Sequence, residues 1–167
     1  MTTDEFVRLF STFERSAFRL ETRQQYLVDE EAELVHAFLE GRPSPPSAAM
    51  DQWLSLIRTN TNAGKRMYRV HILEQPLTGY VRWELSTYPA NAAAGEQIFI
   101  ADRARLKDLR EDFWLFDDRD LVTLRYDEDG HWLGVDLRPE SDLDRYRVMR
   151  DLALAEAVPL ADYLAKA

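Results

Sequence analysis

Helical and strand patterns alternate along the chain after residue 50, and this alternation constrains the fold more than any other feature. Strands that are separated by helices pair in parallel through right-handed crossovers. Asp129-Gly130, between two apolar runs, is typical of an antiparallel hairpin. The sequence therefore predicts an α/β or α+β fold, with helices flanking one mixed sheet of about five strands. The expected strands cover 67–73, 97–100, 112–117, 121–126 and 132–137.

The N-terminal residues have a different pattern from the rest of the chain. Apolar residues recur at helical spacing over 3–12, whereas 13–20 is ambiguous because Phe18 and Leu20 alternate with charged residues as in a short strand. Three prolines within Gly41–Ser47 can neither continue a helix nor pair centrally in a sheet. We expect one compact domain, made of an N-terminal helical arm at 1–41, a Pro-rich linker at 42–49 and an α/β body at 50–167.

Length, composition and charge exclude several classes of protein. The 167 residues suffice for one domain with a sizeable core, and the absence of cysteine excludes disulfide frameworks and thiol chemistry. The formal net charge of −9 gives no field that attracts phosphates, so we expect no direct binding of nucleic acid. Charged residues interrupt the first apolar cluster, Phe6–Phe18, and no run approaches the roughly 20 apolar residues of a membrane span. We expect a cytoplasmic protein without membrane contact.

Motifs of the common nucleotide-dependent enzymes and hydrolases are absent from the sequence. The six glycines form no dinucleotide-binding or phosphate-binding loop, and there is no Gly-x-Ser-x-Gly elbow. The three histidines lack the spacing that places two imidazoles on one face of a helix. We interpret His36, His71 and His131 as structural residues. The sequence thus predicts no cofactor, no metal site and no familiar catalytic residue.

Asp112 and Asp117 are the first candidates for a functional site, because they belong to the densest group of acidic residues. The carboxylates within 117–120 could hold a hard cation, although aspartates are also common in solvated turns between strands. Asp112 precedes an apolar strand, where a charge is tolerated only if it is solvated or paired. If Asp112 is paired, we expect Arg82 or Arg110 as its partner.

Arg82 and Trp83, with Glu84 next to them, are the second candidates, because a cation beside an aromatic ring suits a pocket for an anionic or planar ligand. Trp114 is a further aromatic candidate. The competing interpretation places the tryptophans in the core, since Trp53, Trp83, Trp114 and Trp132 all fall on expected helices or strands. The candidate ligand-binding residues are therefore Arg82, Trp83, Asp112, Trp114 and Asp117.

Four stretches of the chain carry a resemblance to a known family. They are Phe13–Glu21, Gly79–Leu85, Asp112–Asp117 and Arg150–Ala155. Together they resemble a family of uncharacterised actinobacterial proteins of about this length, known as a domain of unknown function. Members are often encoded near helix-turn-helix regulators, so the resemblance implies a regulatory partner. It brings no catalytic residues.

A more distant resemblance concerns the fold. The expected order of elements from Trp53 to Asp117 is similar to one half of a phospholipase D-type domain. That superfamily has His-x-Lys-x-x-x-x-Asp at the third of these strands. With its Asp placed on Asp117, Arg110 stands at the His position and Asp112 at the Lys position. The resemblance implies a phospholipase D-like topology that lacks the nucleophile and the phosphate-stabilising lysine, and hence no phosphodiesterase activity.

Two classes of function follow from the sequence. The first is a non-catalytic cytosolic sensor or adaptor that binds a small ligand or a protein partner and serves a helix-turn-helix regulator. The alternative is a hydrolase-type enzyme with an acidic site around Asp112 and Asp117, assisted by Arg82 or His71. Two carboxylates in one pocket with pKa values pushed apart would favour the enzyme. A cleft without convergent titratable groups would favour the adaptor.

Overall fold

A mixed seven-stranded sheet forms the centre of the protein, in a computed structural model that describes all residues from Met1 to Ala167. The strands are β1 (Ser16–Glu21), β2 (Arg66–Leu73), β3 (Gln97–Asp102), β4 (Asp112–Phe116), β5 (Asp120–Tyr126), β6 (Trp132–Leu137) and β7 (Val158–Pro159). Their order in the sheet is β6-β5-β4-β1-β2-β3-β7. β1 pairs in parallel with β2, and β2 with β3, whereas all other pairs are antiparallel. The expected mixed α/β sheet is confirmed.

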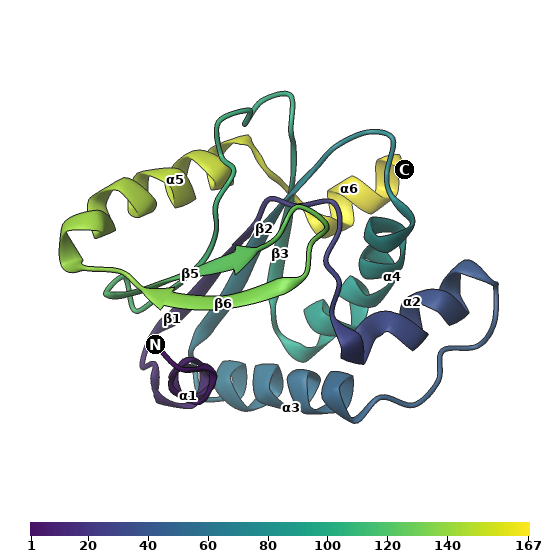
Figure 1. Ribbon diagram of the computed structural model, residues 1–167, viewed down its shortest axis with the longest axis horizontal. Helices are drawn as coiled ribbons and strands as arrows, with labels where there is room; N and C mark the ends of the chain where they lie inside the picture. The colour runs from purple at the N-terminus through teal and green to yellow at the C-terminus, as the bar shows by residue number, and fades with distance from the viewer.

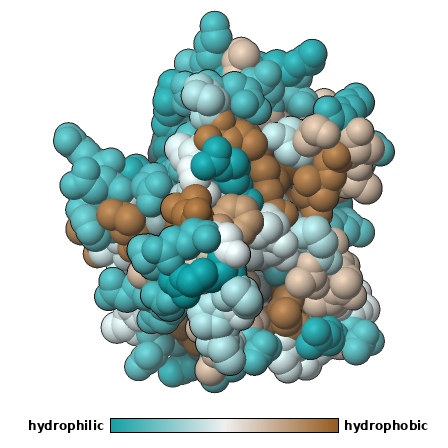
Figure 2. Space-filling model, turned by 90° about the vertical axis from the view of Figure 1, so that its right-hand side faces the viewer, coloured by the Kyte–Doolittle hydropathy of each residue, from teal (hydrophilic) through white to brown (hydrophobic).

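Helices cover both sides of the sheet (Figure 1). They are α1 (Thr3–Thr12), α2 (Ala32–Leu39), α3 (Ala48–Asn62), α4 (Gly79–Ala94), α5 (Leu143–Glu156) and α6 (Leu160–Lys166), with single 3₁₀ turns at Asp29–Glu31 and Glu140–Asp142. α5 packs on one side, and α1, α3 and α4 on the other. The side that carries α2, α4 and α6 exposes apolar patches within a largely hydrophilic surface (Figure 2). None of the helices combines the length and apolar character that a membrane crossing requires.

The estimate of about five strands is too low, because the sequence left β1 ambiguous and gave no sign of β7. β7 has only two residues, too few for a recognisable pattern. β1 lies at the centre of the sheet, so residues 1–41 contribute a core strand as well as helices. Arg19 and Glu21 obscured the central position of β1. Charged residues at every second position are typical of a strand with one exposed face, whereas both residues are buried here.

α4 is longer than its sequence predicts, because it continues past Pro89 instead of stopping before it. Proline within a helix removes one hydrogen bond and costs about 3 kcal/mol. Residues on both sides of it, Tyr88 and Asn91, are buried, so packing against the sheet outweighs that cost. The helix ends instead at Gly95, whose φ of +119° and close approach to the side chain of Thr61 both favour glycine.

The two faces of the sheet differ in polarity. Phe18 and Leu20 of β1 lie in an apolar core that α5 covers. Arg19 and Glu21 alternate with them and therefore point to the other face. At one end of that second face, residues such as Ala17 form an apolar cluster with α1 and α3. Its other end is occupied by buried charged residues.

Candidate functional site

A cavity of about 380 Å³ lies over the polar part of the second face, walled by residues of α3, α4 and the segment before α2. This volume is typical of sites for small molecules. Its walls are rich in aromatic rings, contributed by Tyr26, Trp53, Tyr80, Trp83, Trp114 and Tyr126. Its floor carries charged groups of β1 and β2, among them Arg19, Glu21 and Arg69.

The pairing of β1 with β2 brings these charged groups together. In the parallel register Arg19 lies beside Arg69, and Glu21 beside His71. Residues at alternate positions share a face, so these four side chains form one compact group. α4 lies over them and adds Glu84, which also lines the cavity.

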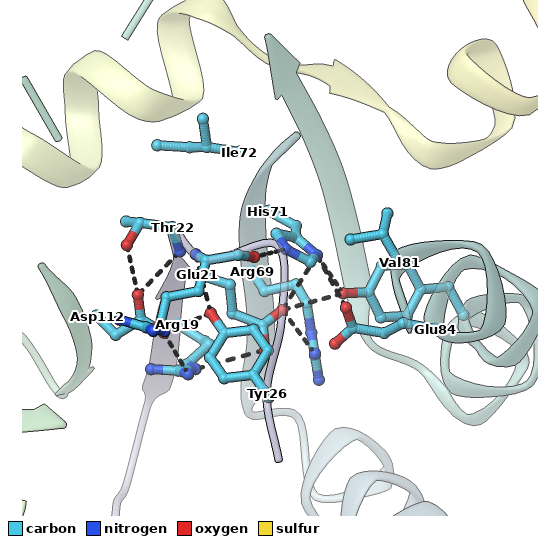
Figure 3. A network of polar contacts seen from close by, with 12 residues as sticks. Arg19, Glu21, Thr22, Tyr26, Arg69, His71, Ile72, Val81, Glu84 and Asp112 are labelled. Atoms are coloured by element: carbon cyan, nitrogen blue, oxygen red, sulfur yellow. Dashed lines mark hydrogen bonds and ion pairs between the residues drawn. The ribbon is translucent and has the colours of Figure 1, made fainter. Parts of the chain in front are cut away.

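Asp112 holds one half of the polar network, beneath the cavity (Figure 3). Its carboxylate accepts hydrogen bonds from Nη2 of Arg19 at 2.9 Å and from the hydroxyl of Tyr26 at 2.5 Å. Thr22 donates both its backbone N–H, at 2.9 Å, and its hydroxyl, at 2.6 Å. The ion-pair partner of Asp112 is therefore Arg19, in place of the expected Arg82 or Arg110, because β1 is the unexpected neighbour of β4.

Arg69 and Glu21 hold the other half. Arg69 donates from Nε to Glu96 at 2.5 Å and from Nη1 to Glu21 at 3.2 Å. The hydroxyl of Tyr88 donates to the same Glu21 oxygen at 3.0 Å. Burial raises the pKa of Glu21, but the nearby cations, Arg69 first, outweigh it and lower this pKa to about 2. Glu21 is therefore a permanently ionised carboxylate.

His71 is fully buried at the junction of β2 and α4. Its Nε2 lies 3.0 Å from the carbonyl oxygen of Arg23, and its Nδ1 lies 2.9 Å from the hydroxyl of Tyr88 and 3.2 Å from Oε2 of Glu84. Burial lowers the pKa of His71, but Glu84 and Glu21 outweigh burial and raise it to about 9. His71 is thus an imidazolium at neutral pH, with a specific electrostatic role beyond that of a packed structural residue.

Two other carboxylates at the cavity hold their protons more tightly than usual. Burial raises the pKa of Glu31 to about 7, against the lowering effect of its 2.7 Å hydrogen bond from Tyr80, and repulsion from Glu84 and Glu21 adds to the rise. Burial, followed by repulsion from Glu21, also raises the pKa of Glu84. One cavity therefore contains carboxylates whose pKa values are pushed apart.

Three buried polar atoms of the cavity walls have no hydrogen-bond partner. They are Nη1 of Arg19, Oε2 of Glu84 and Oδ1 of Asn91. Oε2 of Glu84 lies near His71 but accepts no hydrogen bond from it. Buried polar groups in proteins are nearly always hydrogen-bonded, so three exceptions around one cavity are unusual. All three belong to residues that line the cavity.

Two groups of residues have the ligand spacing of a metal site. Glu21, His71 and Glu84 place their donor atoms within 4.8 Å of one another, and so do Asp127, Asp129 and His131. The first set combines imidazole and carboxylate, which suit Zn²⁺. However, Arg69 and Tyr88 already bind the Glu21 oxygen of that set. The second set is largely exposed and belongs to the turn that joins β5 to β6.

The structure brings together three of the five residues singled out in the sequence. Trp83 and Trp114 are buried and line the cavity, and Asp112 binds Arg19 beneath it. Arg82 is exposed on α4 and does not line the cavity. Of the other tryptophans, Trp53 also lines the cavity, whereas Trp132 is 39% exposed, unlike the core residue that its strand predicts.

Asp117 lies at the opposite end of β4 from Asp112, so the two aspartates do not form one acidic site. Its carboxylate accepts hydrogen bonds from the backbone N–H groups of Glu14, Arg15 and Ser16 at 2.7–2.9 Å. These contacts fix the turn between α1 and β1. The sequence signals a carboxylate here, but its role is to hold the backbone.

The sequence analysis missed three of the four central residues of the site, Arg19, Glu21 and Arg69, and named only Glu84. A signal was present, because β1 and β2 both alternate apolar with charged residues, as in Phe18–Glu21 and Tyr68–His71. Opposite charges on two strands that are neighbours in a sheet indicate a paired face. Recognising the pattern required knowing that β1 is a strand and that it pairs with β2.

Comparisons with known proteins agree with the expected family. No curated protein matches the sequence. The model of a domain of unknown function, DUF6879, matches residues 4–165, which is nearly the whole chain. The chain therefore belongs to the DUF6879 family.

Proposed function

We propose that this protein is a non-catalytic cytosolic sensor that binds a small molecule in the cavity between β1, β2 and α4. The observation that carries the proposal is the set of three unpartnered buried atoms at Arg19, Glu84 and Asn91, all on residues that line this cavity. Leaving a buried polar group unsatisfied costs about 1–3 kcal/mol. A ligand that bonds to these atoms recovers that free energy.

The surrounding network supports binding in preference to chemistry. Asp112 and Glu21 already have several donors each, and these contacts hold the floor of the cavity rigid. A preformed floor reduces the entropy that is lost when a ligand binds. Aromatic walls provide apolar contact area without many rotatable bonds.

The regulatory setting is part of the proposal. We place the sensor in an actinobacterial cytoplasm, where its ligand changes how it contacts a helix-turn-helix regulator. The distant resemblance to phospholipase D-type domains adds one expectation to the proposal, which is that the protein has no phosphodiesterase activity. In the alignment that places the family's Asp on Asp117, Arg110 and Asp112 stand where the catalytic histidine and lysine would be.

The test uses a blocked cavity and a matched control. Ala49 and Ala48 are neighbouring exposed residues in the first turn of α3, but only Ala49 lines the cavity. The wild-type chain, Ala49→Trp and Ala48→Trp are incubated with a cell extract and isolated, and their bound small molecules are identified by mass spectrometry. We expect a compound retained by the wild type and Ala48→Trp and lost from Ala49→Trp. Identical small-molecule content in all three contradicts the proposal.

A second candidate function, a hydrolase-type enzyme, is favoured by one observation. Glu31 and Glu21 line the same cavity with pKa values of about 7 and about 2, the separation typical of a general acid beside an ionised carboxylate. This pair replaces the expected Asp112 and Asp117. The compound retained by the wild type decides between the two functions. An unaltered compound identifies a sensor, whereas conversion that Glu31→Gln abolishes identifies an enzyme.

A further inference from the structure

We propose that the ligand of the cavity is a small organic cation that carries N–H donors, such as an ammonium or guanidinium compound. This inference rests on the proposed function and names the class of ligand. Three features carry it: the carboxylate of Glu31 without a cationic partner, the aromatic walls of the cavity, and acceptor atoms without a hydrogen bond.

The buried ionic groups beneath the cavity are balanced in number. The members of the network are all buried and linked by ion pairs of 3.8 Å or less. Its cations are Arg19, Arg69 and His71, and its anions are Glu21, Glu84, Glu96 and Asp112. A fourth buried cation, Arg103, donates to the backbone carbonyl of Thr22, whose N–H and hydroxyl bind Asp112, and its charge acts on Asp112. Four buried cations therefore compensate four buried anions.

Glu31 adds a further carboxylate to this balanced group. It lines the cavity from the segment before α2, close to Glu84 and Glu21, and no cationic side chain pairs with it. Burial is the main cause of the raised pKa values of Glu31 and Glu84, and repulsion between the carboxylates adds to it. A bound cation would compensate Glu31. An anionic ligand would add to the repulsion and is disfavoured.

Aromatic rings enclose the space above these carboxylates. Trp53, Trp83 and Trp114 line the cavity together with Tyr26, Tyr80 and Tyr126. Arg19 already lies over the ring of Trp114, and Arg23 over that of Tyr126, so the other four rings remain for a ligand. The faces of aromatic rings carry partial negative charge and attract cations, by about 0.5–2 kcal/mol for each favourable contact. A cavity that combines such rings with the unpaired carboxylate of Glu31 suits an organic cation.

The unpartnered acceptors specify the kind of cation. Oε2 of Glu84 and Oδ1 of Asn91 lie on the same helix, seven residues apart. Oδ1 of Asn91 has no partner, and Oε2 of Glu84 pairs with His71 at 3.2 Å without a hydrogen bond, so each can accept from a donor. A quaternary ammonium ion has no N–H group to offer, whereas primary amines and guanidinium groups do. Nη1 of Arg19 needs an acceptor instead, which a hydroxyl or carbonyl oxygen of the ligand supplies.

The experiment compares probes that share a body and differ in charge. Tryptamine, tryptophol and indole-3-propionate form one set, and phenethylamine, phenethyl alcohol and 3-phenylpropionate a second. Dissociation constants are measured by calorimetry and ligand-observed NMR with the wild type, Ala49→Trp and Ala48→Trp. We expect the dissociation constant of each amine to be at least about tenfold lower than that of its alcohol, and we expect the acids not to bind. Binding of the amines is lost in Ala49→Trp only.

Two further arms test the details. N,N,N-trimethyltryptammonium keeps the charge but has no N–H donor on its cationic head, so we expect it to bind more weakly than tryptamine.

Glu31→Gln removes one carboxylate of the cavity and is expected to weaken the binding of tryptamine several-fold. Glu33→Gln, at an exposed position of α2 away from the cavity, is the matched control. Equal binding of tryptamine by Glu31→Gln and Glu33→Gln contradicts the inference.

The outcomes separate this inference from the proposed function. Alcohols or acids that bind in the cavity as tightly as the amines overturn the cationic ligand and leave the sensor function standing. Equal affinity of the trimethylated probe overturns the requirement for N–H donors. Failure of every probe to bind the wild type overturns the inference alone, because the proposed function is decided by the compound that the wild type retains from the cell extract.

Discussion

The two faces of the sheet are built from the same strands but are stabilised in different ways. Under α5, residues such as Phe18, Leu20 and Phe113 form an apolar core. On the other face, the alternating positions Arg19 and Glu21 are also buried but belong to an ionic network. The first face gains about 25 cal/mol for each Å² of apolar surface removed from water. The second must recover a desolvation penalty of several kcal/mol for each ion through pairing.

This difference indicates where selection for function has acted. Well-packed apolar residues often stabilise a protein as much as a buried ionic network, or more. A network that also leaves polar atoms unpartnered beside a cavity therefore reflects a requirement other than stability. We assign stability mainly to the face under α5, and ligand binding to the face under α4.

The largest effect is expected from matched substitutions of nearly equal size on the two faces of β4. Asp112→Asn removes the partner of buried Arg19 with almost no change in volume, so we expect a loss of about 3–5 kcal/mol in the free energy of unfolding. Leu115→Met, under α5, conserves volume and should cost less than about 1.5 kcal/mol. Urea denaturation measures both. Equal losses would mean that removing the buried charge destabilises the protein no more than a volume-conserving change in the apolar core.

A somewhat smaller effect is expected from pH, to which only the polar face responds. His71 has a pKa of about 9 in the folded protein and 6.5 in the reference state. A raised pKa stabilises the folded protein fully below pH 6.5, and this contribution is lost as pH rises to about 9. The difference corresponds to about 3 kcal/mol. We expect the free energy of unfolding, measured in urea, to fall across this interval.

Glu84→Gln tests the assignment of this pH dependence. Glu84 makes the largest favourable contribution to the raised pKa of His71, so the variant should lose stability less steeply between pH 6.5 and 9. A slope that is unchanged in Glu84→Gln would assign the pH dependence to another group.

The third prediction concerns the opposite end of β4. Asp117→Ala removes the acceptor of three backbone N–H groups, so we expect a loss of about 1.5–3 kcal/mol in the free energy of unfolding. Asp117 has a φ of +53°, which asparagine tolerates, and Asp117→Asn keeps one acceptor oxygen and should cost less. Binding of tryptamine should be unchanged in both variants, because Asp117 does not line the cavity. Loss of binding in a stable Asp117 variant would return this residue to the functional site.

The regular parts of the fold were predictable because their signals are local. The alternating residues of β2 and the Asp129-Gly130 turn identify their elements without knowledge of their neighbours. β1 was ambiguous because its charged residues are buried only when it pairs with β2 and β4. That pairing joins residues nearly fifty and a hundred positions apart, which no local pattern encodes.

For the candidate site too, the sequence indicated individual residues but not the partners that the fold brings to them. Trp83, Trp114 and Asp112 were singled out for residue type, and all three are at the cavity or in its floor. The partners of Asp112 come from β1 and the segment that follows it, and Glu84 reaches His71 only because α4 crosses over β2. Sequence reasoning included Arg82 because it lies beside a tryptophan. On a helix, adjacent residues point in different directions.

The smallest effect is expected at Arg82, which tests where the ligand-binding region ends on α4. Arg82 is exposed on α4 and outside the cavity, although the residues that follow it, Trp83 and Glu84, both line the cavity. Substitutions at exposed positions without special contacts change the free energy of unfolding by less than about 0.5 kcal/mol. We expect Arg82→Ala to have a stability within that range and an unchanged affinity for tryptamine, as measured by urea denaturation and calorimetry. Arg58→Ala, at an exposed position of α3, is the matched control for loss of one surface cation from an acidic protein. Weaker binding in both variants would report the net charge of the protein, whereas weaker binding in Arg82→Ala alone would extend the binding site from the inner to the outer face of α4.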